Sequence, residues 1–473
     1  MIALYMSTEE KEFSLRDKRI VLIACCIAGF VSPLITTMIN PAIPAISDEF
    51  GISAHNQGWL IMSYFLSSVA FLVPMSRLSD LYGKRKILIV GIVVVLISAL
   101  MSAIADSFAT LLFWRVIMGM GTACISSTSI SMIVEIYPKA HRGLPLAINT
   151  MCIYIGASVG PGLGGMLTEI FEWRSIFFSL IPFSVAGLIA TLYFKTDFKT
   201  SEGEPFDMRG ALLYALGIIV LMYGIITLPD ALSGLFIAGG IVLLIAFFNF
   251  ESKAEHPVLM VKLFSGKVFR RSNIAAFLNY GSSFAVLYTV NLYLQYIVGL
   301  GPATAGMIIL LQPVIQAAIT PFSGRMSDKI DPRILTTSGM MLMCASTVMM
   351  MFLSSEVNMI KIYLILMFTG AGYALFSAPN TNLIMGNVCP KNYSESSGVI
   401  SVMRQVGMMS SIAIVMCMIS LNMGTTAAVE PETFDAFINS IRYSFAVCFV
   451  LAVIGCFMTW FSRDDNDANE DRM

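Results

Sequence analysis

Long apolar runs of about twenty residues recur along the whole chain, separated by short charged or Pro/Gly-rich breaks. A helix needs about 20 apolar residues to cross a bilayer core of roughly 30 Å. The pattern therefore predicts 14 membrane-spanning helices. They are centred near residues 30, 66, 96, 122, 156, 185, 218, 242, 285, 314, 343, 370, 408 and 451.

The composition agrees with this pattern. Of the 473 residues, 57% are hydrophobic and 12% are charged, whereas soluble domains carry about 25% charged residues. The net charge of −1 gives no reason to expect a nucleic acid partner. Nearly all nine cysteines fall inside apolar runs, where they act as small hydrophobic residues, so we expect no disulfide framework.

Basic residues are distributed unevenly between the connecting loops. Lys and Arg accumulate on the cytoplasmic side of membrane proteins. If the N-terminus is inside, the outer segments contain only Arg174, Lys361 and Arg442. The run that begins at Ile20 is as long as a full span and lacks a small-residue cleavage site. We therefore expect an uncleaved first helix, a multi-pass protein of the cell membrane, and two cytoplasmic termini.

A short loop motif occurs twice. Ser76-Arg-Leu-Ser-Asp80 with Lys84-Arg85 recurs as Gly324-Arg-Met-Ser-Asp328 with Pro332-Arg333. Such a repeat predicts two related halves. The expected divisions are an N-terminal cytoplasmic segment (1–19), a six-helix bundle (20–195), a loop (196–207), two additional helices (208–250), a loop (251–272), a second six-helix bundle (273–462) and an acidic tail (463–473).

Two motifs resemble those of a known family. The loop from Ser76 to Lys86 is similar to the G-x-L-a-D-r-x-G-r-[KR] signature of the major facilitator superfamily, with Ser76 replacing the first Gly. The fifth helix carries Gly156-x-x-x-Gly160-Pro161-x-x-Gly164-Gly165, which resembles the antiporter motif g-x-x-x-G-P-x-x-G-G. Across essentially the whole chain, the sequence resembles the 14-helix drug:proton antiporters of this superfamily.

The resemblance implies a fold and an activity. The fold would be all-α and integral to the membrane, a major facilitator fold with two six-helix bundles plus two extra central helices. The activity would be secondary active export of small amphipathic molecules by alternating access, as in multidrug efflux, in exchange for protons. Its partners would be a small-molecule substrate, H⁺ and the lipid bilayer. We expect a monomer without cofactor or metal.

The motifs supply candidate residues for conformational switching. A carboxylate and a basic cluster at helix ends can pair with each other in only one of two states, although such a loop can also serve only to orient the chain. Glycines four apart allow a close helix contact, whether for sealing the halves or for general packing. The switch candidates are Asp80, Gly83, Lys84, Arg85, Glu135, Arg142, Asp328 and Arg333. The antiporter-motif candidates are Gly156, Gly160, Pro161, Gly164 and Gly165.

Polar residues inside the apolar runs are candidates for a substrate cavity. Arg115 lies some 13 Å inside the membrane, where a guanidinium costs several kcal/mol unless it faces water or a partner; it is either functional or bonded structurally. The aromatic face of the ninth helix is either cavity wall or plain packing. The cavity candidates are Thr36, Thr37, Asn40, Arg115, Asn149, Tyr280, Tyr288, Asn291, Gln295, Gln312, Gln316 and Arg404.

The first helix departs from the family pattern. The stretch from Leu34 to Pro44 resembles l-D-x-T-i-v-N-v-A-l-P, but Ile35 occupies the position of the membrane-embedded acid. We therefore hypothesise a preference for neutral or anionic compounds over quaternary ammonium cations, with Arg115 near the solute. Helix-nine tyrosines that bind a cation, or Glu135 drawn into the cavity, would argue against this preference.

Other classes of function fit less well. The sequence has no G-x-x-x-x-G-K-[ST] loop for a nucleotide. Its histidines, His55, His141 and His256, stand in different loops, so they predict neither a metal site nor a nucleophile–base pair. We therefore expect no enzyme. Two alternatives remain open: an exporter of one endogenous metabolite or lipid-like compound, and a non-transporting membrane sensor on the same scaffold.

Overall fold

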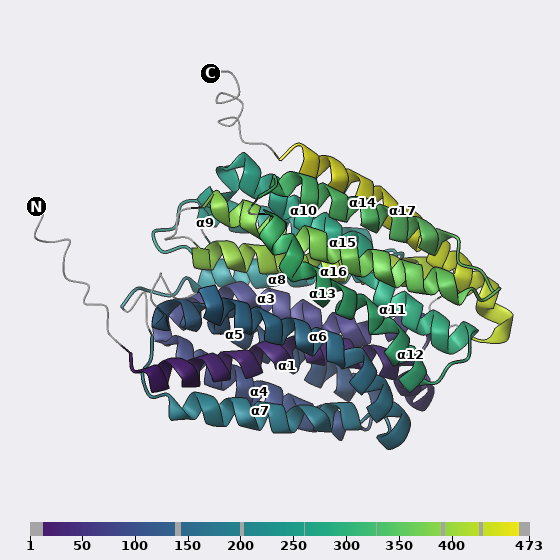
Figure 1. Ribbon diagram of the computed structural model, residues 1–473, viewed down its shortest axis with the longest axis horizontal. Coiled ribbons are helices and arrows are strands. Elements are labelled where there is room, and N and C mark those ends of the chain that lie inside the picture. The colour runs from purple at the N-terminus through teal and green to yellow at the C-terminus, as the bar shows by residue number, and fades with distance from the viewer. Residues whose placement is uncertain are drawn as a thin grey trace, which may run out of the picture.

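The computed structural model describes residues 13–137, 143–198, 203–259, 261–327, 329–388, 393–424 and 429–462. These residues form long helices that run side by side (Figure 1). Helices are the expected result, because in lipid each backbone N–H and C=O group must find its partner within its own segment. In the described residues, 13 helices are long and apolar enough to cross a membrane.

The first half contains six spans, which lie together as the purple-to-blue part of Figure 1. They are α1 (Leu15–Phe50), α3 (Trp59–Tyr82), α4 (Lys84–Ala103), α5 (Phe108–Ile136), α6 (Gly143–Phe171) and α7 (Ser175–Tyr193), with the short α2 (Ala54–Gln57) between α1 and α3. Local chemistry sets several boundaries. The Ser107 side chain, for example, accepts a hydrogen bond from the Thr110 N–H at the start of α5, as N-cap serines do.

The second half also contains six spans, two of which are interrupted. They are α10 (Lys267–Ser283) with α11 (Ala285–Leu292) and the π-helical η2 (Tyr293–Ile297); α12 (Pro302–Ile309) with α13 (Leu311–Ser327); α14 (Pro332–Met351); α15 (Met359–Gly386); α16 (Tyr393–Met423); and α17 (Phe434–Trp460). The first of these segments, α10 with α11 and η2, is not among the 13 helices counted above and adds a fourteenth span. It is broken near Phe284, so neither piece is long enough by itself.

The two halves pack their helices in the same way. In the first half α1 lies against α6, α4 against α5, and α4 against α7. In the second half the corresponding pairs are α10 with α16, α14 with α15, and α14 with α17. The predicted fold class, two related six-helix bundles with two additional helices, is confirmed.

The additional helices are α8 (Met208–Ile226) and α9 (Ser233–Glu251). They pack on each other, and α8 also contacts α3 and α16. The Tyr214 hydroxyl of α8 donates to the Val69 carbonyl oxygen of α3 at 3.1 Å. By contrast, α9 exposes large apolar side chains such as Leu235 and Val242, so its outer face suits lipid.

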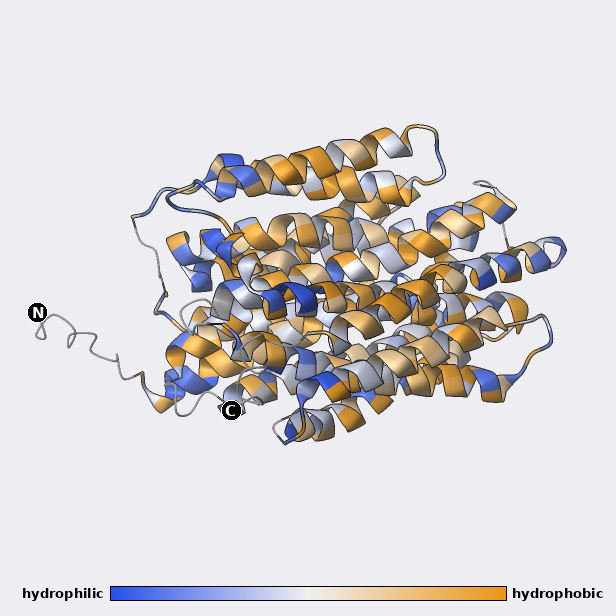
Figure 2. Cartoon of the chain, turned by 90° about the horizontal axis from the view of Figure 1, so that it is seen from above, coloured by the Kyte–Doolittle hydropathy of each residue, from blue (hydrophilic) through white to orange (hydrophobic). Residues whose placement is uncertain are grey.

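Polar residues gather at the two ends of the bundle, whereas apolar residues cover its middle (Figure 2). We call the end at which α1 begins and α17 ends the basic end, since it carries Lys84, Arg85 and Arg271. The other end, with Glu49, Arg174 and Gln295, is the opposite end.

Candidate functional site

The first signature loop is held within the first half, at the basic end. Lys84 is buried and pairs with two carboxylates. Its Nζ lies 3.3 Å from Asp80 Oδ1 in the last turn of α3, and also pairs with Glu135 in the last turn of α5. The loop is therefore tied to the end of α5.

The same loop is also tied to the end of α7, through a residue that the motif does not contain. Gly83 has φ 112°, and a side chain there would overlap the carboxylate of Asp197. This carboxylate accepts a hydrogen bond from the Arg85 N–H at 2.9 Å at the start of α4. The Arg85 Nε in turn donates to the Thr191 carbonyl at the end of α7. The Asp197 carboxylate thus lies at the positive N-terminus of α4, and the Arg85 guanidinium lies at the negative C-terminus of α7.

The second copy of the motif is only partly described. The Arg333 guanidinium pairs with Asp331, and the Asp331 carboxylate also accepts the Arg333 backbone N–H at 2.9 Å at the start of α14. Asp328 and Arg142, two of the switch candidates, lie outside the described residues. Asp331 and Asp197 were not predicted as partners. Only Asp331, directly before α14, has a sequence position that suggests a capping role; Asp197 follows the end of α7 and caps α4 only through the tertiary fold.

The glycine stripe of α6 lies against α1. A side chain at Gly156 would overlap the Phe30 carbonyl oxygen, and one at Gly164 would overlap the Met38 carbonyl oxygen. Gly160 lies against the Thr37 hydroxyl. On another side of α6, Gly165 faces the Pro302 carbonyl oxygen of α12 in the second half, and the Pro161 carbonyl oxygen lies against Gly306 of the same helix.

Several candidates join the two halves at the opposite end. The Asn291 Nδ2 of α11 donates to the Asn40 carbonyl oxygen of α1 at 2.6 Å. One turn later, the Gln295 Nε2 donates to the Pro41 carbonyl oxygen at 3.0 Å and to the Asn291 Oδ1 at 3.0 Å. We call Asn40, Pro41, Asn291 and Gln295 the outer latch.

Further contacts surround the outer latch. The Gln57 Nε2 donates to the Tyr296 hydroxyl at 2.8 Å, and His55 Nδ1 lies 3.2 Å from the Met416 carbonyl oxygen. The Ala303 N–H donates to Glu169 at 2.9 Å. In the described part of the chain, most hydrogen bonds between the two halves lie at this end; deeper in the bundle, Tyr154 of the first half also bonds Ser377 and Thr320 of the second.

A group of polar and aromatic residues from both halves lies deeper in the bundle. Tyr280 of α10 and Tyr373 of α15 have ring centroids 5.2 Å apart. Tyr154 of α6, in the first half, lies near Tyr280, Ser377 and Arg404. We call Tyr154, Tyr280, Tyr373 and Arg404 the central cluster. Only Tyr280 and Arg404 were candidates from the sequence.

Other cavity candidates lie elsewhere. Arg115 is fully buried inside the first half: its Nε donates to the Leu60 carbonyl oxygen at 3.0 Å, and its guanidinium stands 4.9 Å from the Tyr64 ring centroid. The Asn149 Nδ2 donates to the Cys25 carbonyl oxygen at 2.9 Å. Thr36 and Thr37 both donate to the Pro33 carbonyl oxygen within their own helix.

Three candidates have no polar contact that assigns a role. The Tyr288 hydroxyl and the Gln312 Oε1 are buried and have no hydrogen-bond partner among the described residues. Gln316 contributes its backbone carbonyl to Thr320. They lie in α11 and α13, no polar contact among the described residues joins them to the outer latch or to the central cluster, and their assignment to a substrate cavity stays a prediction.

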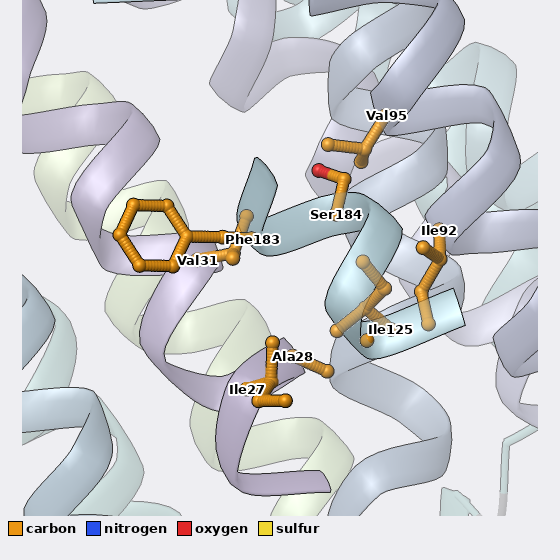
Figure 3. Close-up of a pocket in the computed structure, with 9 residues that line it drawn as sticks. Ile27, Ala28, Val31, Ile92, Val95, Ile125, Phe183 and Ser184 are labelled. Atoms are coloured by element: carbon orange, nitrogen blue, oxygen red, sulfur yellow. The ribbon is translucent and has the colours of Figure 1, made fainter. Parts of the chain in front are cut away.

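The described residues include no group of three or more His, Cys, Asp or Glu that could hold a metal ion. A small space inside the first half is lined mainly by hydrocarbon, including Val31, Ile92 and Phe183 (Figure 3). Its one labelled hydroxyl, on Ser184, donates to the Leu180 carbonyl oxygen. This space offers no polar group to recognise a solute.

Known proteins resemble the chain over nearly its full length. It is 24% identical over 454 residues to the riboflavin transporter RibZ of Clostridioides difficile (strain 630), covering 96% of this chain and 99% of the relative. It is 26% identical over 401 residues to the multidrug resistance protein Stp of Mycobacterium tuberculosis (strain CDC 1551 / Oshkosh), covering 83% and 74%.

Solved structures show the same fold at low sequence identity. The human organic anion transporter MFSD10 (TETRAN) aligns with a TM-score of 0.67 at 14% identity, covering 93% of this chain and 99% of that one. A bacterial homolog of the human lysosomal transporter Spinster, inward-facing and unoccupied, aligns with a TM-score of 0.68 at 14% identity, covering 95% and 98%.

The family model described as Major Facilitator Superfamily matches residues 25–412 and 272–472. It thus covers both repeated halves and the additional helices between them. The helix packing, the two signature loops and this match agree with one another. The chain is a membrane transporter of the Major Facilitator Superfamily.

Proposed function

We propose that this transporter exports small amphipathic organic molecules across the cell membrane by alternating access, in exchange for protons. The observation that carries the proposal is the uneven distribution of hydrogen bonds between the halves: most of those in the described residues lie at the opposite end, in and around the outer latch. Two halves joined at one end can exchange that contact for one at the other end.

The orientation follows from the charges. Because Lys and Arg accumulate on the cytoplasmic side, the basic end and both termini are assigned to the cytoplasm. The outer latch then faces the outside, so the halves are closed toward the exterior. A solute would enter from the cytoplasm, which is the starting point for export.

The names of several relatives support drug efflux. Besides Stp, they include the lincomycin resistance protein LmrB of Listeria monocytogenes, 24% identical over 461 residues. A second candidate function is transport of a single metabolite. The match to the riboflavin transporter favours it, because that match covers more of both chains than the match to Stp does.

Proton coupling requires a carboxylate other than the acid of the first helix, since Ile35 occupies that position. We assign it to Asp80 and Glu135, which share Lys84. Protonation of either carboxylate would remove one of the two charges that hold the Lys84 ammonium, and so weaken the tie between the signature loop and α5. Such a change at the basic end would favour one of two conformations.

The first prediction concerns Asp80. We expect Asp80→Asn to slow proton-driven flux in proteoliposomes by roughly tenfold. A tenfold change corresponds to about 1.4 kcal/mol, the size expected for the loss of one charge contact. Equilibrium solute binding should stay within about twofold, because Asp80 lies at the basic end. Asp17→Asn, a change of a half-buried carboxylate in the first turn of α1, serves as the control.

Two results would contradict the proposal. Wild-type protein that binds solute but moves none under a pH gradient would be a sensor rather than an exporter. Loss of solute binding in Asp80→Asn with normal flux of bound solute would place Asp80 in the binding site instead of the switch.

A further inference from the structure

Two arginines lie deep within the spans, in contrasting surroundings. Arg115 is fully buried and bonded to backbone. Arg404 lies eleven residues after the first residue of α16, about 16 Å along the helix. It is only half-buried, and within the described part of the chain its guanidinium has neither a hydrogen-bond acceptor nor a carboxylate partner. A charge at this depth is costly unless water or a ligand contacts it.

The residue that approaches Arg404 from the first half holds the equivalent place in the repeat. Tyr154 also lies eleven residues after the start of its helix, and α6 corresponds to α16 in the packing of the halves. Tyr154 lies near Arg404, Tyr280 and Ser377. The two halves therefore bring an aromatic ring and an unpaired cation together at one depth.

The second half supplies two more rings with fixed hydroxyl groups. Tyr280 and Tyr373 stand 5.2 Å apart at an interplanar angle of 31°. The Ser283 Oγ donates to the Tyr373 hydroxyl at 2.9 Å, and the Tyr280 hydroxyl donates to Ser377 at 3.4 Å. These bonds fix the orientation of the two rings, which are 8% and 4% exposed and also pack with Met343; an aromatic solute that enters between the halves would pack against them.

The charges determine which solute this cluster suits. In the described spans, carboxylates lie only in the terminal turns, as with Asp48, Glu135 and Glu169. An organic cation in the central cluster would meet Arg404 and no opposite charge. A guanidinium, by contrast, binds a carboxylate or sulfonate with two parallel hydrogen bonds.

We propose that Arg404, Tyr154, Tyr280 and Tyr373 bind a flat organic anion, with its ring against the tyrosines and its acidic group on Arg404. This rests on the proposed transport function and names the class of solute. It assigns the charge contact to Arg404 of the second half in place of Arg115.

The test compares two dyes that share a xanthene ring and differ in charge, fluorescein (anionic) and rhodamine 6G (cationic). Fluorescence anisotropy at pH 8 measures their binding to the purified full-length protein in detergent. We expect wild-type protein to bind fluorescein at least tenfold more tightly than rhodamine 6G. Arg404→Gln should weaken fluorescein binding by about tenfold or more, and Arg404→Lys should recover part of it.

A matched variant controls for loss of a cation within a span. Arg442 of α17 is exposed, and its Nε donates to the Leu353 carbonyl oxygen at 3.0 Å. Arg442→Gln should leave both dye affinities within twofold of wild type. Tyr280→Ala should weaken fluorescein binding without reversing the preference for the anion.

The proposal is overturned if wild-type protein binds rhodamine 6G as tightly as fluorescein, or binds neither. It is also overturned if Arg404→Gln keeps the wild-type melting temperature and the wild-type affinity for fluorescein. If Arg404→Gln does not fold, the comparison of the two dyes on wild-type protein decides. Fluorescein binding that depends on Arg404 but is never followed by flux would reject the transport function and leave the site in place.

Discussion

At the scale of single residues, close contacts between neighbouring helices, such as α6 and α1, depend on glycine. At Gly164 of α6, a Cβ atom would overlap backbone atoms of Met38 in α1. Backbone cannot rotate away as a side chain can, so relief requires the two helices to separate. At Gly239 of α9, the nearest atom would be the Val220 side chain at 3.8 Å, an ordinary contact.

These two positions give a matched prediction. We expect Gly164→Ala to lower stability by about 1–3 kcal/mol, which is typical of overpacking, and to lower the melting temperature in detergent. Gly239→Ala should be neutral or slightly stabilising, because Ala favours a helix by up to about 1 kcal/mol over Gly. Equal melting temperatures for the two variants would show that α6 and α1 adjust freely at Gly164.

At the scale of elements, prolines explain why α1 can accept bonds from the other half. Pro44 has no N–H, so the carbonyl of Asn40, four residues earlier, has no partner within the helix. That same carbonyl accepts the Asn291 Nδ2. A break in one helix thus supplies an acceptor for the neighbouring half.

The prediction for this element uses the missing N–H. Pro44→Ala would let α1 bond its own Asn40 carbonyl and so compete with Asn291. We expect faster amide hydrogen exchange over 285–297, by at least about threefold, and the same effect in Asn291→Leu. Asn422→Leu serves as the control, because the Asn422 side chain bonds only within its own helix. Unchanged exchange in both latch variants would show that the outer latch does not hold the halves together.

At the scale of the whole molecule, the long loops on either side of α8 and α9 meet the first signature loop at the basic end. Glu204, before α8, pairs with Arg77 of the signature loop. His256, after α9, lies 3.3 Å from the same carboxylate. The additional helices are therefore connected to the switch region through exposed charges, which contribute little each.

This connection predicts a pH dependence. The hydrogen bond from Arg77 lowers the pKa of Glu204 below its ordinary value of 4.5. A carboxyl group with a lowered pKa stabilises the folded state above its unfolded pKa, and this contribution is lost as the pH falls through its folded pKa. Glu204→Gln should therefore lower the melting temperature slightly at pH 7, and the difference from wild type should shrink below pH 4.5. A difference that grows on acidification would contradict the pairing.

The family motifs and one of their partners, Glu135, could be predicted from the sequence, but other partners such as Asp197 could not. Lys84 and Glu135 were candidates for one switch, and they pair. Arg115 was expected near the solute because the cost of a charge in the membrane marks it as unusual. At Arg115 protein contacts meet part of that cost, although its Nη2 has no hydrogen-bond partner among the described residues. At Arg404 an accessible position does so, and the sequence does not distinguish the two cases.

The sequence by itself determined the class of protein, the spans and the two related halves, because crossing a bilayer imposes a length and an apolar composition on each segment separately. Only the tertiary structure decided which polar residues meet. Tyr154 approaches Arg404, and Asn291 bonds the Asn40 carbonyl, across more than two hundred residues of chain in each case. Such contacts depend on how whole helices pack and where they break, which no local pattern encodes.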